Sequence, residues 1–302
     1  MTKEEYKSAG AEARGVFELN ATGDAFRLAV FTDLHHDIFD PAGAIRAKKD
    51  LRRHARNLRP DMLAVLGDTA LTTFNKGRTR AFVRLMDSFG LPWTAVLGNH
   101  EGERAFEVPR RDVVKMYGAS KTFLGKAEIP GVTGCGNQAV VVVRDGSPWQ
   151  ILYFLDSGGG RRGHDHIRQS QLDWMGEVHG LYPGTPGTVF MHVPPYAYQE
   201  AYEALSRGEA ALFGGALRER VKPGGRAQSA ALLAKAGELS VRAFVSGHDH
   251  ANDFEILWRG MRYIYARCGG YTWCGYDERA KDARGCSVLV YRPDGGMALE
   301  RH

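Results

Sequence analysis

The chain has 302 residues, with 40 Lys and Arg against 35 Asp and Glu, so its formal charge at neutral pH is +5. An apolar share of 43% and a charged share of 25% are ordinary for a folded globular protein and exclude disordered, collagen-like and coiled-coil chains. The mild positive charge suits an anionic substrate. The Lys and Arg residues are scattered, so a nucleic-acid partner is disfavoured, although it stays open.

The N-terminal sequence MTKEEYKSAGAEARG is polar, and no segment has the run of apolar residues that a membrane span needs. The four cysteines show no C-x-x-C spacing, which argues against a structural zinc site. We therefore expect a cytoplasmic protein without a membrane partner, unless a leader precedes this sequence in the natural chain.

Apolar runs alternate with segments of helical periodicity, which is typical of strand–helix units in a buried sheet. The first half predicts, in chain order, strand 26–33, helix 42–58, strand 61–68, helix 79–90, strand 92–100 and a hairpin at 137–157. The second half predicts helix 166–178, strand 187–195, helix or loop over 196–223, helix 226–236, strand 241–250, and hairpins at 254–267 and 285–301. No linker or repeat interrupts this order. We expect one mixed α/β domain over residues 1–302, with a core at about 26–300 and an N-terminal extension at 1–22.

Residues of three chemical types follow five of the predicted strands, in the sequences FTDLHH, LGDTA, LGNHEGE, FMHVPP and VSGHDH. Sites in open α/β sheets form outside the carboxyl ends of the strands, so these residues are predicted to meet at one edge. Carboxylate, amide oxygen and imidazole are donors that divalent first-row metals accept. In addition, Gly67, Gly98 and Gly247 each precede a candidate ligand directly, where a glycine lets the backbone turn sharply and approach closely.

The ordered set D-x-H, G-D, G-N-H-E, a later H and G-H-x-H resembles the signature of the calcineurin-like metallophosphoesterases, over about residues 26–268. The resemblance implies a four-layer α-β-β-α sandwich of two mixed sheets with two divalent metal ions, Mn, Fe or Zn, at one edge. The implied ligands are Asp33, His35 and His250 for one ion, Asn99, His192 and His248 for the other, and Asp68 as the bridge between them.

The same resemblance implies a metal-dependent phosphoester hydrolase acting on a phosphomonoester. A hydroxide bridging two metals about 3.5–4 Å apart would attack phosphorus in line. Asp68 and His100 would be the catalytic residues, with His100 near the leaving group, where it stabilises charge and can protonate the leaving oxygen. Glu101 is expected to orient a neighbouring histidine.

Purple acid phosphatases carry a tyrosine three residues after the Asp of the G-D motif, where this chain has Leu71. The departure removes the tyrosinate that would select ferric iron, so a colourless Mn, Fe(II) or Zn site is favoured. The sequences YFLDSGG, QSQLDWM and GHDHANDF are similar to a subgroup related to a yeast cell-cycle phosphatase and to plant purple-acid-phosphatase-like proteins.

Four residues outside the ligand set are candidates for substrate contacts: His36, Arg161, Arg162 and Tyr271. The arginines stand on a glycine-rich loop and could bind a phosphate bidentately, and the tyrosine could stack on an organic leaving group. Each has an ordinary alternative, namely a histidine that supports a ligand, a solvent-exposed loop, or an aromatic ring in the core.

Two alternative functions stay open. The same metal centre can hydrolyse diesters, so the alternative enzyme is a phosphodiesterase acting on a cyclic nucleotide or a nucleic-acid end. The other alternative is a non-catalytic scaffold, but all seven ligand positions and His100 carry competent residues, which argues against it. The sequence decides neither the physiological substrate nor the metal nor the oligomeric state.

Overall fold

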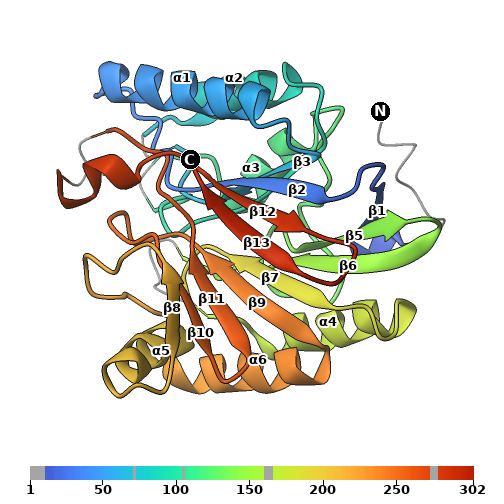
Figure 1. Ribbon diagram of the computed structural model, residues 1–302. Helices are drawn as coiled ribbons and strands as arrows, with labels where there is room; N and C mark the ends of the chain where they lie inside the picture. Colours follow the sequence, from blue (N-terminus) through green and yellow to red (C-terminus); the bar gives the residue numbers. More distant parts are fainter. Residues whose placement is uncertain (1–10, 71–72, 104–105, 160–165, 273–277) are drawn as a thin grey trace.

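In the computed structural model, which describes residues 11–70, 73–103, 106–159, 166–272 and 278–302, two mixed β-sheets lie face to face between helices (Figure 1). The five-stranded sheet has the order β13 (Met297–Arg301), β12 (Ser287–Tyr291), β2 (Phe26–Phe31), β3 (Met62–Leu66), β4 (Trp93–Val96). The eight-stranded sheet has the order β1 (Val16–Asn20), β5 (Gln138–Arg144), β6 (Ser147–Phe154), β7 (Gly187–Met191), β9 (Val241–Ser246), β11 (Met261–Tyr265), β10 (Glu255–Trp258), β8 (Ala211–Gly214).

Helices cover the outer face of each sheet. The five-stranded sheet is covered by α1 (Pro41–Asn57), α2 (Lys76–Asp87) and α3 (Arg110–Tyr117), and the eight-stranded sheet by α4 (Gln169–Leu181), α5 (Ala197–Ser206) and α6 (Arg226–Glu238) (Figure 1). Two short 3₁₀ segments, Glu12–Arg14 and Glu278–Ala283, complete the elements. The predicted four-layer α-β-β-α sandwich is therefore confirmed.

Strands of both sheets, such as β3, β4 and β7, are buried on both faces, which explains their continuous apolar sequences. In β2, Leu28 and Val30 belong to the core between the two sheets, whereas Ala29 and Phe31 face the helices. This alternation follows from the two-residue period of a strand. At the start of α1, the Asp40 side chain accepts a hydrogen bond from the Gly43 N–H at 2.9 Å, and Pro41 occupies the first turn.

The region expected to be an N-terminal extension contains a strand. β1 pairs in parallel with β5, with Val16 opposite Ala139, so the core begins well before residue 26. The short run VFELN did not predict a strand because Glu18 interrupts it, and the Glu18 carboxylate in fact accepts a hydrogen bond from the Tyr182 hydroxyl at 2.9 Å.

Two further elements, α3 and the exposed edge strand β8, were also not predicted. Both are short, and the one turn of apolar residues in α3 is flanked by charged ones.

The strands β2, β3 and β4 also end earlier than predicted. They stop at Phe31, Leu66 and Val96, and the candidate ligands lie on the turns that follow. None of the helices in the described part of the chain is both long enough and apolar enough to cross a membrane.

Candidate metal centre

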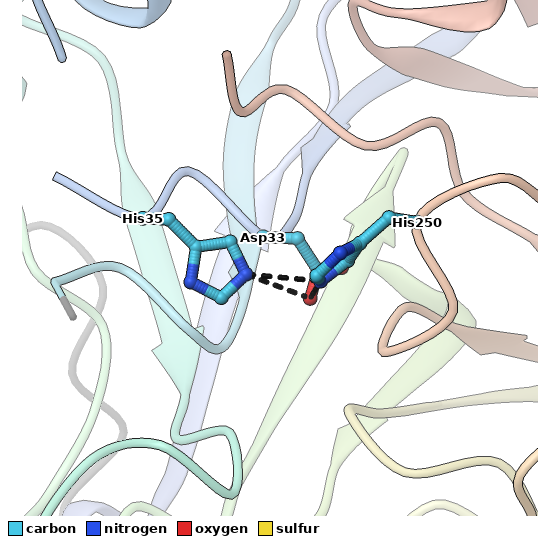
Figure 2. A group of neighbouring side chains, drawn as sticks. All are labelled: Asp33, His35 and His250. Carbon is cyan, nitrogen blue, oxygen red and sulfur yellow. Dashed lines mark hydrogen bonds and ion pairs between the residues drawn. The ribbon is translucent and has the colours of Figure 1, made fainter. Parts of the chain in front are cut away.

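Five loops converge at one edge of the sandwich, three following β2, β3 and β4 of the five-stranded sheet and two following β7 and β9 of the eight-stranded sheet. They form two groups of side chains, in each of which the potential ligand atoms lie within 4.8 Å of one another: Asp33, His35 and His250, and Asp68, His192 and His248. The first group is drawn in Figure 2, where the three side chains point toward a common position.

Within the first group, the His35 Nε2 atom lies 3.0 Å from the His250 Nε2 atom. The Asp33 Oδ1 atom lies 3.4 Å from His250 Nε2 and 3.7 Å from His35 Nε2. Two imidazole nitrogens and one carboxylate oxygen therefore enclose a small space from three sides (Figure 2).

Within the second group, the His192 Nε2 atom lies 3.1 Å from Asp68 Oδ2 and 3.0 Å from Asn99 Oδ1. The Asn99 side chain thus lies beside this group. The Asp68 Oδ2 atom also lies 4.0 Å from the His35 Nε2 atom of the first group. Asp68 is accordingly the side chain that stands between the two groups.

The His192 ring has a defined orientation. Its Nδ1 atom lies 2.7 Å from the Leu66 carbonyl oxygen. A carbonyl only accepts, so Nδ1 carries a hydrogen and Nε2 is the atom that faces Asp68 and Asn99. Metal-ligating histidines are usually oriented in this way, with the other ring nitrogen donating to a carbonyl or carboxylate.

The residues fit a pair of divalent cations, because two buried carboxylate oxygens lack other partners. Among the described residues, the nearest polar atoms to Asp33 Oδ1 and Asp68 Oδ2 are imidazole nitrogens, His250 Nε2 at 3.4 Å and His192 Nε2 at 3.1 Å. When these imidazoles act as ligands through the same nitrogens, neither oxygen has a donor, which is costly in a buried site, and a cation between the oxygen and the imidazoles would satisfy both.

The titration of the group also fits cation binding. Burial lowers the pKa of His35 to about 3 and that of His248 to about 4, so both rings are neutral at pH 7, as metal ligands must be. Burial opposes ionisation of Asp33 and Asp68, but the positive charge of His192 holds the pKa of each below its usual range. Burial likewise disfavours the His192 proton, but Asp68 and Asp33 together raise its pKa to about 10. A bound cation would replace the charge of that proton.

Four candidate ligands adopt left-handed backbone conformations, with φ values of 54° at Asp33, 45° at His35, 50° at Asp68 and 81° at His248. Positive φ is uncommon outside glycine, and such conformations cluster at functional sites. The conformation is held by backbone contacts between the loops, such as the hydrogen bond from the His35 N–H to the Asp68 carbonyl at 2.9 Å.

Two of the glycines that precede ligands allow a close approach of neighbouring loops. A Cβ atom on Gly98 would lie 2.1 Å from Asp68 Oδ1, and one on Gly247 would lie 2.0 Å from Thr32 Oγ1. Any side chain at either position would displace a loop that carries a candidate ligand. The repeated glycines in the sequence therefore have a steric reason.

Glu101 binds backbone amides rather than a histidine ring, contrary to the role expected from the sequence. Its buried carboxylate accepts hydrogen bonds from the N–H groups of Asp68 at 3.0 Å, Thr69 at 2.6 Å and Gly98 at 2.7 Å. These bonds connect the loop after β3 to the loop after β4. Glu101 therefore positions Asp68 through the backbone.

Arg110, at the start of α3, was not singled out in the sequence. Its guanidinium donates to the carbonyl oxygens of Gly98 and Glu101, the latter at 3.0 Å, and to Asp156 Oδ1 at 2.6 Å. It thereby fixes the loop that carries Asn99. A lone Arg near a helix start gives no signal in the sequence, whereas Asp156 lies within the YFLDSGG motif.

His100 borders the two groups from the solvent side. Its N–H donates to Asp68 Oδ1 at 2.9 Å, its Nε2 atom lies 3.9 Å from Asp68 Oδ2, and its Nδ1 atom pairs with the Glu103 carboxylate. The side chain is 29% exposed, whereas the side chains of His35 and His192 are fully buried. His100 is thus accessible to a ligand that arrives from solvent.

The other candidates for substrate contacts lie elsewhere. The His36 ring is buried against Phe82, with ring centroids 6.1 Å apart, in the core beneath α2. The Tyr271 ring packs beneath the Arg46 guanidinium of α1, whose carbon lies 4.0 Å from the ring centroid. Arg161, Arg162 and Leu71 are outside the described residues.

The fold and the clustered ligand types define the class of metal-dependent phosphoesterases built on a β-sandwich. The family model for the calcineurin-like phosphoesterases matches residues 26–252, which is most of the chain. The chain therefore belongs to the calcineurin-like phosphoesterase family.

Among curated proteins, the chain is 27% identical over 300 residues to "Probable inactive purple acid phosphatase 28" of Arabidopsis thaliana, covering 87% of this chain and 72% of that protein. It is 26% identical to "Probable inactive purple acid phosphatase 14" of the same plant, covering 76% of this chain but only 62% of that protein. A crystal structure of a dimetal phosphatase from Danio rerio superposes with a TM-score of 0.57 at 14% identity, covering 92% of this chain and 96% of that chain. These matches agree with the resemblance to purple-acid-phosphatase-like proteins.

Proposed function

We propose that the protein is a phosphoester hydrolase that binds two divalent cations and acts on phosphomonoesters. The observation that carries the proposal is the pair of buried carboxylate oxygens, Asp33 Oδ1 and Asp68 Oδ2, each of which faces an imidazole nitrogen from the opposite sheet. Such a site has no evident use without cations, and this donor set suits Mn, Fe(II) or Zn.

In this proposal, Asp33, His35 and His250 would hold one ion, Asn99, His192 and His248 would hold the other, and Asp68 would contribute to both. When bound, the two ions would supply an activated water at neutral pH and neutralise charge on the phosphoryl group. Glu101 and Arg110 position these ligands, because they form hydrogen bonds with the loops that follow β3 and β4.

His100 is proposed to act at the leaving group. The Glu103 carboxylate holds Nδ1, so the other nitrogen, Nε2, is directed toward the side of the site where Asp68 lies. Nε2 can then deliver the proton that the leaving oxygen needs. The partial exposure of the ring leaves space for the organic part of the ester.

The two Arabidopsis relatives are named as probable inactive phosphatases. The proposed activity of this chain therefore rests on its own residues. All seven ligand positions carry a carboxylate, an amide or an imidazole, and six of these side chains form the two close groups described above.

The test is an initial-rate comparison on p-nitrophenyl phosphate and bis(p-nitrophenyl) phosphate. The protein is stripped of metal and reloaded with manganese, and Asp68→Asn serves as the blank. A preference for the monoester is expected. A preference for the diester would replace the proposal with a phosphodiesterase, and no turnover of either ester by protein with two bound ions would refute hydrolase activity and favour the scaffold.

A further inference from the structure

A groove of about 770 Å³ lies between α2 and α3 on the outer helical layer. Its apolar part is formed by Val83, Val108 and Met116, together with Pro109 and Ala119. A groove that combines an apolar floor with charged walls is suited to a ligand that is itself partly apolar and partly charged.

The α2 side of the groove carries three exposed cations, Lys76, Arg80 and Arg84. They are spaced four residues apart, so they form a row along one face of the helix. None of the three forms an ion pair with any residue in the described part of the chain. By contrast, Lys115 on α3 is paired with Asp112 at 3.1 Å.

The groove begins at the edge that holds the candidate metal centre. α2 follows the loop that carries Asp68, and α3 follows the loop that carries Asn99, so both helices start at the carboxyl ends of parallel strands. The two loops are joined by a hydrogen bond from the Val108 N–H to Asn75 Oδ1 at 2.9 Å. Lys76 is therefore the cation of this row that lies nearest the candidate metal centre, and Arg84 lies about 12 Å farther along the helix.

An exposed aromatic pair lies on the loops that precede α2 and α3. Phe74, two residues before Lys76, and Phe106, two residues before Val108, stack with ring centroids 5.4 Å apart and an interplanar angle of 14°. The two residues are 69% and 76% exposed, and both adopt positive φ, 59° and 64°. Large apolar side chains held in strained conformations and in solvent indicate a binding surface.

We propose that this groove binds an acidic peptide segment of a phosphoprotein substrate, whose phosphorylated side chain enters the candidate metal centre. The inference rests on the proposed function and names its substrate class. Acidic side chains of the segment pair with Lys76, Arg80 and Arg84, while its apolar side chains contact the floor and the two Phe rings. Because an extended chain advances about 3.3–3.6 Å per residue, the row spans about four residues of the segment.

The lining favours a peptide over a single-stranded nucleic acid. The carboxylate of Asp87 also lines the groove, and it would repel a backbone that carries a charge on every nucleotide. A peptide can place its acidic residues opposite the cations and leave neutral residues opposite the carboxylate.

The test is fluorescence anisotropy on the purified full-length protein. The probes are a fluorescein-labelled ten-residue peptide with a central phosphoserine and flanking Glu and Leu, and its Glu→Gln counterpart. The Glu peptide is expected to bind more tightly. The double variant Arg80→Glu/Arg84→Glu is expected to weaken that binding by about tenfold, since each reversal replaces an attraction with a repulsion.

The matched control is Arg52→Glu/Arg56→Glu, which makes the same change of charge at the same spacing on the exposed face of the neighbouring helix α1. Circular dichroism spectra identical to that of the wild type show that both variants are folded. Equal affinity for the two peptides, or equal weakening by the control variant, overturns the proposal. So does an oligodeoxythymidine of ten nucleotides that binds more tightly than the Glu peptide.

Because anisotropy needs no turnover, this result is independent of the proposed activity. If the wild type hydrolyses neither nitrophenyl ester but binds the Glu peptide through Arg80 and Arg84, peptide binding in the groove is supported and the proposed hydrolase activity is refuted. If it hydrolyses the monoester but shows no preference for the Glu peptide, the hydrolase activity is supported and peptide binding in the groove is refuted.

Discussion

The two sheets contribute different chemistry to the same edge. The five-stranded sheet supplies all the oxygen donors, Asp33, Asp68 and Asn99, together with His35, whereas the eight-stranded sheet supplies only imidazoles. Each candidate group draws on both sheets. Neither sheet alone offers a complete set of ligands, so the centre exists only when the two sheets pack together.

The same edge also holds the sheets together directly. The His248 N–H donates to Asp33 Oδ2 at 3.0 Å, and the His192 ring donates to the Leu66 carbonyl at 2.7 Å. Each bond connects a loop of the eight-stranded sheet to the five-stranded sheet. The ligands are therefore positioned by contacts that do not require a cation.

The largest effect is expected for Asp68→Asn, which removes the carboxylate that lies between the two groups. We expect the rate on p-nitrophenyl phosphate to fall by at least about 10³-fold, the upper end for loss of one charge-stabilising group. Mass spectrometry of bound metal should show fewer than two ions per chain. A variant with wild-type rate and full metal content would contradict the assigned position of Asp68.

Removing one imidazole of the eight-stranded sheet at a time tests whether the two groups bind separate ions. His250→Ala and His248→Ala should each weaken one ion and retain the other, since the two residues belong to different groups. The affinity of the affected ion should fall by more than about 100-fold, because loss of a supporting partner alone costs about 10–100-fold. Isothermal titration with Mn²⁺ measures both sites. Loss of both ions in both variants would show that the two groups are one site.

A smaller effect is expected from Glu101→Gln, which keeps the size of the side chain but removes its negative charge. One of its three backbone donors would face an NH₂ group, so the loops of Asp68 and Asn99 would shift relative to each other. We expect a loss of about 10–100-fold in metal affinity or rate. Glu128→Gln, which changes a half-exposed carboxylate paired with Arg111, is the control and should leave both unchanged.

Metal removal should give the smallest effect, measured on stability. Each ion that binds only the folded state at 100 times its dissociation constant adds about 2.7 kcal/mol to the free energy of unfolding. For a chain of this size, the thermal midpoint should drop by roughly 5–10 °C in excess chelator. The same treatment should lower the midpoint of Asp68→Asn by less than that of the wild type, and an equal drop in both proteins would argue against binding across the two sheets.

That the candidate ligands lie close together was predictable from two signals. Each of them follows an apolar run, and five such runs in order end in a carboxylate, an amide or an imidazole. The strands themselves were also predictable, because burial on both faces makes sequences such as MLAVL and FRLAVF continuous.

The supporting residues were not predictable, because their roles depend on which loops come together. Glu101 accepts amides from a loop more than thirty positions away, and Arg110 reaches carbonyls and Asp156 across two elements. His36 and Tyr271, chosen because they are close to motifs in sequence, point instead into the layer of α1 and α2. The neighbours of a residue in the chain do not determine the direction of its side chain after a turn.

The most direct test of the central claim is anomalous X-ray diffraction from crystals of the protein loaded with Mn²⁺. We predict two anomalous peaks on opposite sides of Asp68 Oδ2, one among Asp33, His35 and His250 and the other among Asn99, His192 and His248. A single peak, or peaks held by ligands from only one sheet, would contradict a dinuclear centre assembled between the two sheets.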